Sequence, residues 1–75
     1  MVTVKDLSER LSKLVGLAGI PKQRACLELV SESGYAVGLP TVMNALAGKN
    51  TRPATRAVIV AALKKVARKH GVVVA

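Results

Sequence analysis

Few side chains in this sequence could perform covalent chemistry. The single cysteine, Cys26, cannot form an internal disulfide, and together with the single histidine, His70, it cannot complete a metal site. The sequence contains no Ser-His-Asp spacing and no glycine-rich phosphate loop. We therefore expect no enzyme, no cofactor, no metal and no small-molecule substrate. Cys26 is expected to be a small buried residue on a helix.

The cationic side chains indicate a different chemistry. Twelve Lys and Arg residues against four Asp and Glu residues give a formal net charge of +8 in 75 residues. All four acids lie in the first 32 residues, where Asp6 with Arg10 and Glu9 with Lys13 could form i,i+4 pairs on a helix. Residues 33–75 contain seven bases and no acid. This one-sided charge predicts a polyanionic partner, with nucleic acid as the first candidate and an anionic membrane surface as the second.

Proline and glycine divide the chain into four segments that are predicted to be helices of a single domain, residues 1–75. Thr3-x-x-Asp6 fits a capping pattern at the start of the first helix. Pro21 ends that helix and suits the first position of the second. Pro40 starts a short third helix, which Gly48 ends.

The fourth helix is predicted from about Arg52 or Pro53 to Lys69. Apolar residues recur at helical spacing in all four segments, so each segment has one face to bury. The predicted buried faces contain Val4, Leu7, Leu11, Leu14 and Val15; Ala25, Cys26, Leu29 and Val30; Val42, Ala45 and Leu46; and Ile59, Ala62, Leu63 and Val66. The fold class is therefore all-α, a compact four- or five-helix bundle.

Two apolar features lie outside these helical faces. Gly34–Gly38 is typical of a turn, in which Tyr35 is expected to cover the core with its hydroxyl outward. Val72–Val74 is β-prone, so it is predicted to be either a short C-terminal β-strand that pairs at a dimer interface or an apolar tail. A core without Phe or Trp is small and often leaves an apolar face for a partner subunit, so we expect a homodimer.

No membrane span is expected. The longest uncharged run, Gly34 to Gly48, contains proline and glycine and is shorter than the roughly 18 to 20 apolar residues that a span requires. The first residues lack the basic start and apolar run of a signal peptide. We therefore expect a cytoplasmic, nucleoid-associated protein.

Residues 41 to 50 read Thr41-Val42-Met43-Asn44-Ala45-Leu46-Ala47-Gly48-Lys49-Asn50. This run resembles the recognition-helix signature of the lambda-repressor-like and lac-repressor-like helix-turn-helix domains, in which T-V-S-R-x-L-N-G-K is common. Pro53-Ala54-Thr55-Arg56, followed by Val58, Ala61 and Ala62, resembles the S-x-x-T-R-x-x-V-x-x-A helix that often comes next. Gln23 resembles the glutamine that opens the positioning helix. The resemblance covers roughly residues 20 to 67 and implies a helix-turn-helix.

The sequence also departs from that pattern. The turn from Gly34 to Thr41 is about two residues longer than usual, which either lengthens the turn or extends the second helix past Tyr35. Leu39 and Pro40 stand where polar base-reading side chains are common, and Met43-Asn44 replaces the frequent Ser-Arg.

The resemblance implies a small, repressor-like transcription regulator that binds double-stranded DNA through a recognition helix at about residues 39–48. Asn44 is the best candidate base reader, because its amide can bond bidentately to adenine. The candidate base contacts are Leu39, Thr41, Met43 and Asn44. The candidate phosphate contacts are Lys22, Gln23, Arg24, Lys49, Asn50, Arg52 and Arg56.

Other interpretations of these residues remain open. Asn44 could be a solvated surface amide, Met43 could fill the core, and the cations could form an ordinary solvated surface. The rival partners are structured RNA, an anionic membrane surface and another protein. Single-stranded nucleic acid is disfavoured because the chain has one aromatic residue for stacking, and a lipid-bound helix would favour Trp and Phe anchors.

Overall fold

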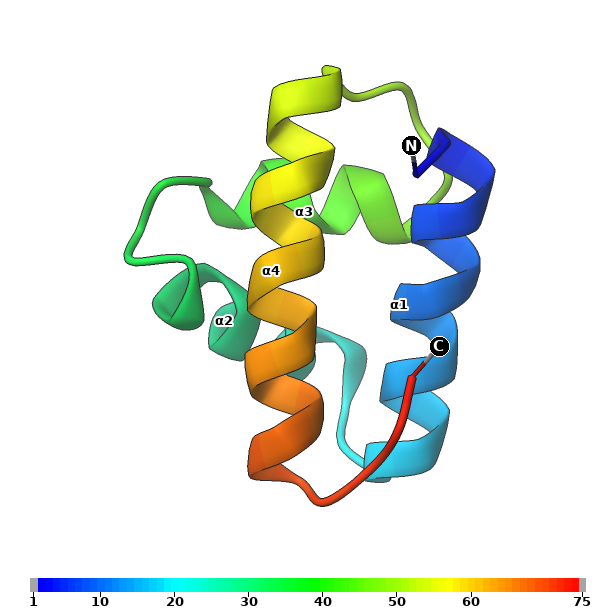
Figure 1. Cartoon of the computed structure of the whole chain (residues 1–75), viewed down its shortest axis with the longest axis vertical. Helices are drawn as coiled ribbons and strands as arrows, with labels where there is room; N and C mark the ends of the chain where they lie inside the picture. Colours follow the sequence, from blue (N-terminus) through cyan, green and yellow to red (C-terminus); the bar gives the residue numbers. More distant parts are fainter. Residues whose placement is uncertain (1, 75) are drawn as a thin grey trace.

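Four helices make up the computed structural model, which describes residues 2–74. They are α1 (Val4–Ala18), α2 (Lys22–Glu32), α3 (Leu39–Leu46) and α4 (Pro53–Lys69). The short helix α3 lies across the bundle and packs on α1 and α2, while the long helix α4 packs on the same two helices (Figure 1). The predicted all-α bundle is therefore confirmed, with four helices in the described residues.

The helix boundaries lie close to those predicted from the prolines, glycines and capping residues. Thr3 caps α1 by accepting a hydrogen bond from the Asp6 N–H at 3.1 Å. Pro21 lies just before α2 rather than at its first position, and Pro40 is the second residue of α3. The connection between α2 and α3 covers residues 33–38, so the extra residues lengthen the turn instead of extending α2.

Three helices end in the same backbone motif. At the end of α3, the N–H of Gly48 bonds to the carbonyl of Ala45 and the N–H of Lys49 bonds to the carbonyl of Asn44. This pair of bonds requires a left-handed residue, and Gly48 has a φ of 80°. The ends of α2 and α4 repeat the pattern, so the chain reverses sharply after each of these helices.

The core is made from the inner faces of all four helices. Every residue of the predicted α4 face is buried, and so are the central leucines of α1. The buried apolar residues are Leu7, Leu11, Leu14, Ala25, Cys26, Leu29, Val37, Val42, Ala45, Ile59, Ala62, Leu63, Val66 and Ala67. Burial raises the pKa of the Cys26 thiol, as expected for a structural cysteine.

Of the two apolar features outside the helices, Tyr35 was predicted wrongly, and Val72–Val74 follows the second of its two alternatives, the apolar tail. Tyr35 does not cover the core, because 76% of its surface is exposed. The possible C-terminal β-strand is not formed, since residues 2–74 contain no strand. The chain instead turns back after α4 (Figure 1), and Val72 and Val74 pack against the core while Val73 faces solvent. Among the described residues, no helix has both the length and the apolar character needed to cross a bilayer.

Candidate nucleic-acid interface

Helix α3 has one buried face and one exposed face. Val42 and Ala45 point into the core and are almost completely buried. Pro40, Met43 and Asn44 are exposed on the opposite side. Because 46% of Met43 is accessible, it does not fill the core. The exposed face of α3 is therefore available to a ligand.

The C-terminal end of α3 is fastened to α1. The Ser8 hydroxyl donates a hydrogen bond of 2.8 Å to the main-chain carbonyl of Leu46. Gly48 passes close to the same serine, since a Cβ there would lie 3.6 Å from its Oγ. The hydrogen bond satisfies one of the carbonyls that a helix leaves free at its end. It also fixes the position of α3 relative to the bundle.

Leu39 is only partly accessible to a ligand. Its side chain is half-buried and packs against the hydrophobic core. The sequence predicts a contact with DNA at this position. In the structure Leu39 is the first residue of α3, and part of its side chain packs on the core. The remaining candidates on α3 are Thr41, Met43 and Asn44.

A polar hollow of about 230 Å³ lies where α3, the following loop and the start of α4 meet. It is lined by Thr41, Asn44, Asn50, Thr51, Arg52 and Thr55. Two candidate base contacts and two candidate phosphate contacts are thus brought together around one hollow. None of the lining residues is acidic, and no side chain caps the first turn of α4. The Thr51 hydroxyl is buried without a hydrogen-bond partner in the described residues.

Thr51 and Thr55 were not predicted as site residues. Arg52 occupies the capping position of α4, so Thr51 lies one residue further out in the loop. Hydroxyl residues on both sides of Pro53 at a helix start could have suggested the hollow, because free N–H groups and hydroxyls at such an end favour anions. The contribution of α3 to the same hollow depends on tertiary packing.

A second hollow, of about 250 Å³, lies on the other side of α3. It is lined by Ser12, Lys22, Met43, Leu46 and Ala47. It brings a candidate base contact, Met43, next to a candidate phosphate contact, Lys22. The exposed ridge of α3 is therefore flanked by a hollow on each side, with Arg52 at one and Lys22 at the other. Gln23 and Arg24 follow Lys22 and are also exposed, in a first turn that no side chain caps.

Arg56 has a structural role. Its side chain is half-buried, and its Nε–H donates to the carbonyl of Val2 at 2.9 Å. A terminal N–H of the same guanidinium donates to the carbonyl of Thr51. Arg56 thus joins the N-terminal segment to the loop that lines the polar hollow. The sequence predicts a phosphate contact for Arg56. Two of its five N–H groups are used inside the protein, and a contact of the others with phosphate stays a prediction.

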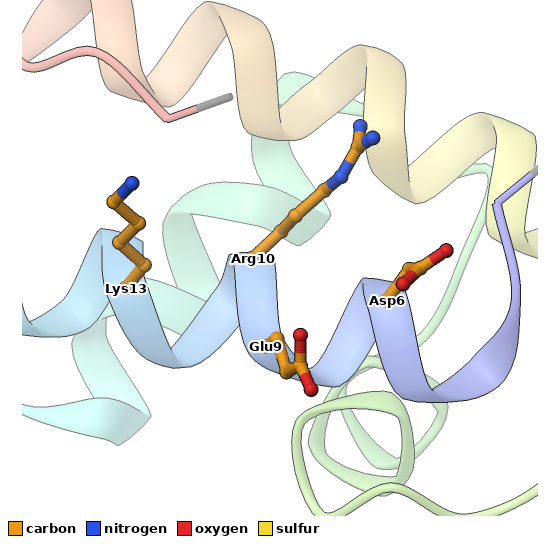
Figure 2. Close-up of a pocket in the computed structure, with 4 residues that line it drawn as sticks. All are labelled: Asp6, Glu9, Arg10 and Lys13. Atoms are coloured by element: carbon orange, nitrogen blue, oxygen red, sulfur yellow. The ribbon is translucent and has the colours of Figure 1, made fainter.

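A hollow of about 330 Å³ on α1 carries mixed charges. It is lined by Asp6, Glu9, Arg10 and Lys13, whose side chains are drawn in Figure 2. The predicted i,i+4 pairs are not closed, because every ion pair within 4 Å in residues 2–74 involves Glu28. Figure 2 shows Glu9 pointing away from the side on which Arg10 and Lys13 extend. With two acids and two bases, this surface is not selective for an anion.

The closed ion pairs lie at the C-terminal end of α4. Glu28 Oε1 is 3.0 Å from Lys69 Nζ and 3.0 Å from His70 Nε2, and Glu28 Oε2 is 3.9 Å from Arg24 Nε. Burial alone would raise the pKa of the Glu28 carboxyl, but hydrogen bonds from Lys69 and His70, with their charges, lower it overall. This cluster joins α2 to α4. Lys64, Lys65 and Arg68, on the same half of α4, are exposed and make no ion pair within 4 Å in residues 2–74.

The residues 2–74 contain no group of three or more His, Cys, Asp or Glu side chains placed to hold a metal ion. Comparison with models of protein families, with curated proteins and with solved structures gave no significant match.

Proposed function

We propose that this chain binds double-stranded DNA, with the exposed face of α3 in the major groove. The observation that carries the proposal is the arrangement around α3, whose exposed ridge lies between two hollows that each contain a cationic side chain. A helix fits the major groove, and the phosphate strands then run along both of its sides. The absence of acids from residue 33 onward supports a polyanionic ligand on this surface.

Sequence reading is assigned to three side chains of α3. Asn44 is exposed and can bond bidentately to adenine N6 and N7. Thr41 can donate to a base or to a phosphate at the polar hollow, and Met43 can contact a thymine methyl from the opposite side. With one amide and one hydroxyl on this face, discrimination between sites is modest, and DNA shape contributes to it.

Affinity is assigned mainly to the groups around α3. Lys22, Gln23 and Arg24 lie at the uncapped start of α2, where free N–H groups favour a phosphate. On the other side, Lys49, Asn50 and Arg52 lie in the loop before α4. These groups position the protein on the duplex without reading its sequence. With the sequence resemblance, this assignment supports a small repressor-like transcription regulator, active as a homodimer at the nucleoid in the cytoplasm.

The direct test is a fluorescence-anisotropy titration of the full chain with a labelled DNA duplex at several salt concentrations. We expect the binding constant to fall linearly with salt on a logarithmic plot, with a slope set by the number of phosphate contacts. Lys13→Gln removes one positive charge from the mixed-charge hollow of α1, away from α3, and is the control for a general effect of net charge. Binding that is independent of salt, or absent, contradicts the proposal.

The same titration distinguishes the rival partners. An RNA duplex has a deep, narrow major groove that α3 cannot enter, so a preference for RNA over DNA would contradict the assigned role of α3. Binding to anionic phospholipid vesicles without binding to the DNA duplex would replace nucleic acid by a membrane surface as the partner.

A further inference from the structure

The second half of α4 has three cationic side chains without an acidic partner. Lys64, Lys65 and Arg68 are all exposed, and none makes an ion pair within 4 Å in residues 2–74. We call these three residues the α4 ridge. The ion pairs of Glu28 use other cations, among them Lys69. The α4 ridge therefore presents three uncompensated positive charges to solvent.

The spacing of these cations is unfavourable for the helix itself. Lys64 and Arg68 are an i,i+4 pair of like charge, and Lys65 forms a second such pair with Lys69. Like charges at this spacing repel and destabilise a helix. The helix dipole favours cations in the last turn, which contains Arg68 and Lys69, so it does not account for Lys64 and Lys65 one turn earlier. Because no acid occurs from residue 33 onward, the compensating anion must come from outside α4.

The α4 ridge faces away from the core. With about 3.6 residues per turn, Arg68 lies on the opposite side of the helix from the buried Ile59 and Val66, and Lys64 and Lys65 flank it. In Figure 1, α4 crosses in front of α3, and residues 64–68 lie in its lower, orange half. Both helices bury their inner faces in one core, so their exposed faces lie on different sides of the molecule.

The α4 ridge is also distant from the polar hollow beside α3. Lys64 lies about 18 Å along the helix axis from Arg52, the cationic side chain of that hollow. A duplex whose major groove holds α3 therefore leaves the α4 ridge uncovered, and this ridge is accessible to a separate ligand.

The chemistry of the α4 ridge favours a phosphate backbone as that ligand. Lys64 and Arg68 are separated by about 6 Å along the axis, over which one strand of DNA presents about two phosphates. The exposed residues that continue the ridge toward the start of α4 are Ala61 and Ala57. A helix that binds a lipid surface would favour large apolar anchors at such positions. The small residues beside the cations therefore favour nucleic acid over a membrane.

We propose that the α4 ridge binds the phosphate backbone of a second DNA duplex, so that a molecule bound through α3 holds two duplexes together. This inference rests on the proposed function, which supplies the first duplex. Contacts to phosphate carry no direct sequence information, so the second duplex can have any sequence. Its retention should weaken steeply with salt, because counterions are released from the phosphates that the ridge contacts.

Two matched variants separate the α4 ridge from a general effect of net charge. Lys64→Gln/Arg68→Gln removes two charges and one repulsive pair, so its melting temperature should be equal to or higher than that of the wild type. The control, Lys5→Gln/Lys13→Gln, removes two charges from exposed positions of α1. Both variants keep the residues assigned to the first duplex. In anisotropy, binding of a single labelled duplex should therefore change by the same small factor in both.

The measurement uses the full chain bound to a biotinylated DNA duplex on a streptavidin surface, with a second, fluorescent duplex of unrelated sequence in solution. The wild type and the control should retain the second duplex. The ridge variant should need about 30-fold more of it for half-maximal retention at low salt, because two phosphate contacts are lost. Equal retention by the ridge variant and the wild type overturns the inference, because two copies of α3 in an oligomer then hold the two duplexes.

The remaining outcomes distinguish this inference from the proposed function. A loss of binding to the first duplex in the ridge variant, but not in the control, overturns the inference because the ridge then contacts the same duplex. A wild type that binds the first duplex and retains no second one also overturns it and leaves the proposed function intact. Retention of anionic phospholipid vesicles in place of the second duplex would assign the ridge to a membrane surface. A wild type that binds no duplex is a failure of the proposed function, and the inference then fails with it.

Discussion

The two ends of α4 differ in whether an acidic side chain lies beside their cations. At the C-terminal end, the Glu28 carboxylate accepts from Lys69 and His70 and links α2 to α4, while Lys64, Lys65 and Arg68 stay exposed. At the N-terminal end, about 24 Å away along the helix, the polar hollow contains Arg52 and no acid. An acidic partner thus gives Lys69 and His70 a structural role at one end of α4, whereas Arg52 at the other end has no such partner in the described residues.

The largest expected effect comes from removing the free cations on both sides of α3. The double variant Lys22→Gln/Arg52→Gln should weaken duplex binding by about 30-fold at low salt and reduce the salt slope by about two, because each lost phosphate contact contributes about 0.9. The unfolding free energy should stay within about 0.5 kcal/mol of the wild type, since both residues are exposed. Anisotropy and urea denaturation measure the two quantities. A loss of stability as large as the loss of affinity would contradict the proposed division between the two ends.

Arg56 has both a structural and a site role, because its guanidinium links the N-terminal segment to the loop that lines the polar hollow. Arg56→Met removes the hydrogen bonds to the carbonyls of Val2 and Thr51. We expect the unfolding free energy to fall by about 1.5 kcal/mol, since two partly buried carbonyls lose their donors. Duplex affinity should fall as well, because the loop that lines the hollow is no longer fixed. If Arg56→Met lowered affinity and the salt slope without affecting stability, Arg56 would be a phosphate contact after all.

The paired end should show the converse pattern. Glu28→Gln keeps the shape of the side chain but removes its negative charge, so the unfolding free energy should fall by about 1 kcal/mol while DNA affinity is unchanged or slightly increased. The matched control is Glu9→Gln, whose carboxylate makes no ion pair within 4 Å in the described residues. An equal effect of the two substitutions on urea denaturation would show that the Glu28 cluster has no special role.

The smallest effect is the dependence of stability on pH. Because the pKa of Glu28 is lower in the folded protein than in the unfolded chain, its carboxylate stabilises the fold above the unfolded pKa of about 4.3. That contribution is lost as the pH falls through the lower folded pKa. The wild type should therefore lose more stability than Glu28→Gln between about pH 5 and pH 3. Parallel curves for the two proteins would remove Glu28 as a source of acid sensitivity.

The sequence predicts the helices better than it predicts the site. Thr3, Pro21, Pro40 and Gly48 act on the backbone within a few residues, so the helix boundaries follow from local chemistry. The bond from Arg56 to Val2 joins residues 54 positions apart, and no local pattern reports it. The base contact predicted at Leu39 rests on its place in the recognition-helix signature, which does not show that the first turn of α3 also packs on the core.

Tyr35 illustrates a second kind of limit. Aromatic character predicts burial, but the motif that ends α2 imposes a left-handed backbone at this position, and the side chain then points into solvent. Two general preferences are in conflict here, and composition does not show which one prevails. The sequence names four of the residues that line the polar hollow, Thr41, Asn44, Asn50 and Arg52, but it does not predict the hollow itself. Thr51 and Thr55 join them only through the packing of α3 against α4.

The way α3 is held has a consequence for engineering. Val42 and Ala45 secure the helix from below, and the Ser8 hydroxyl secures its last turn through a main-chain carbonyl. None of these attachments involves the outward side chains of Met43 or Asn44. Exposed positions of this kind usually accept replacement at a cost within about 0.5 kcal/mol. The outer face of α3 can therefore be varied combinatorially, as a cassette, and a library built there would sample new ligand preferences on an unchanged scaffold.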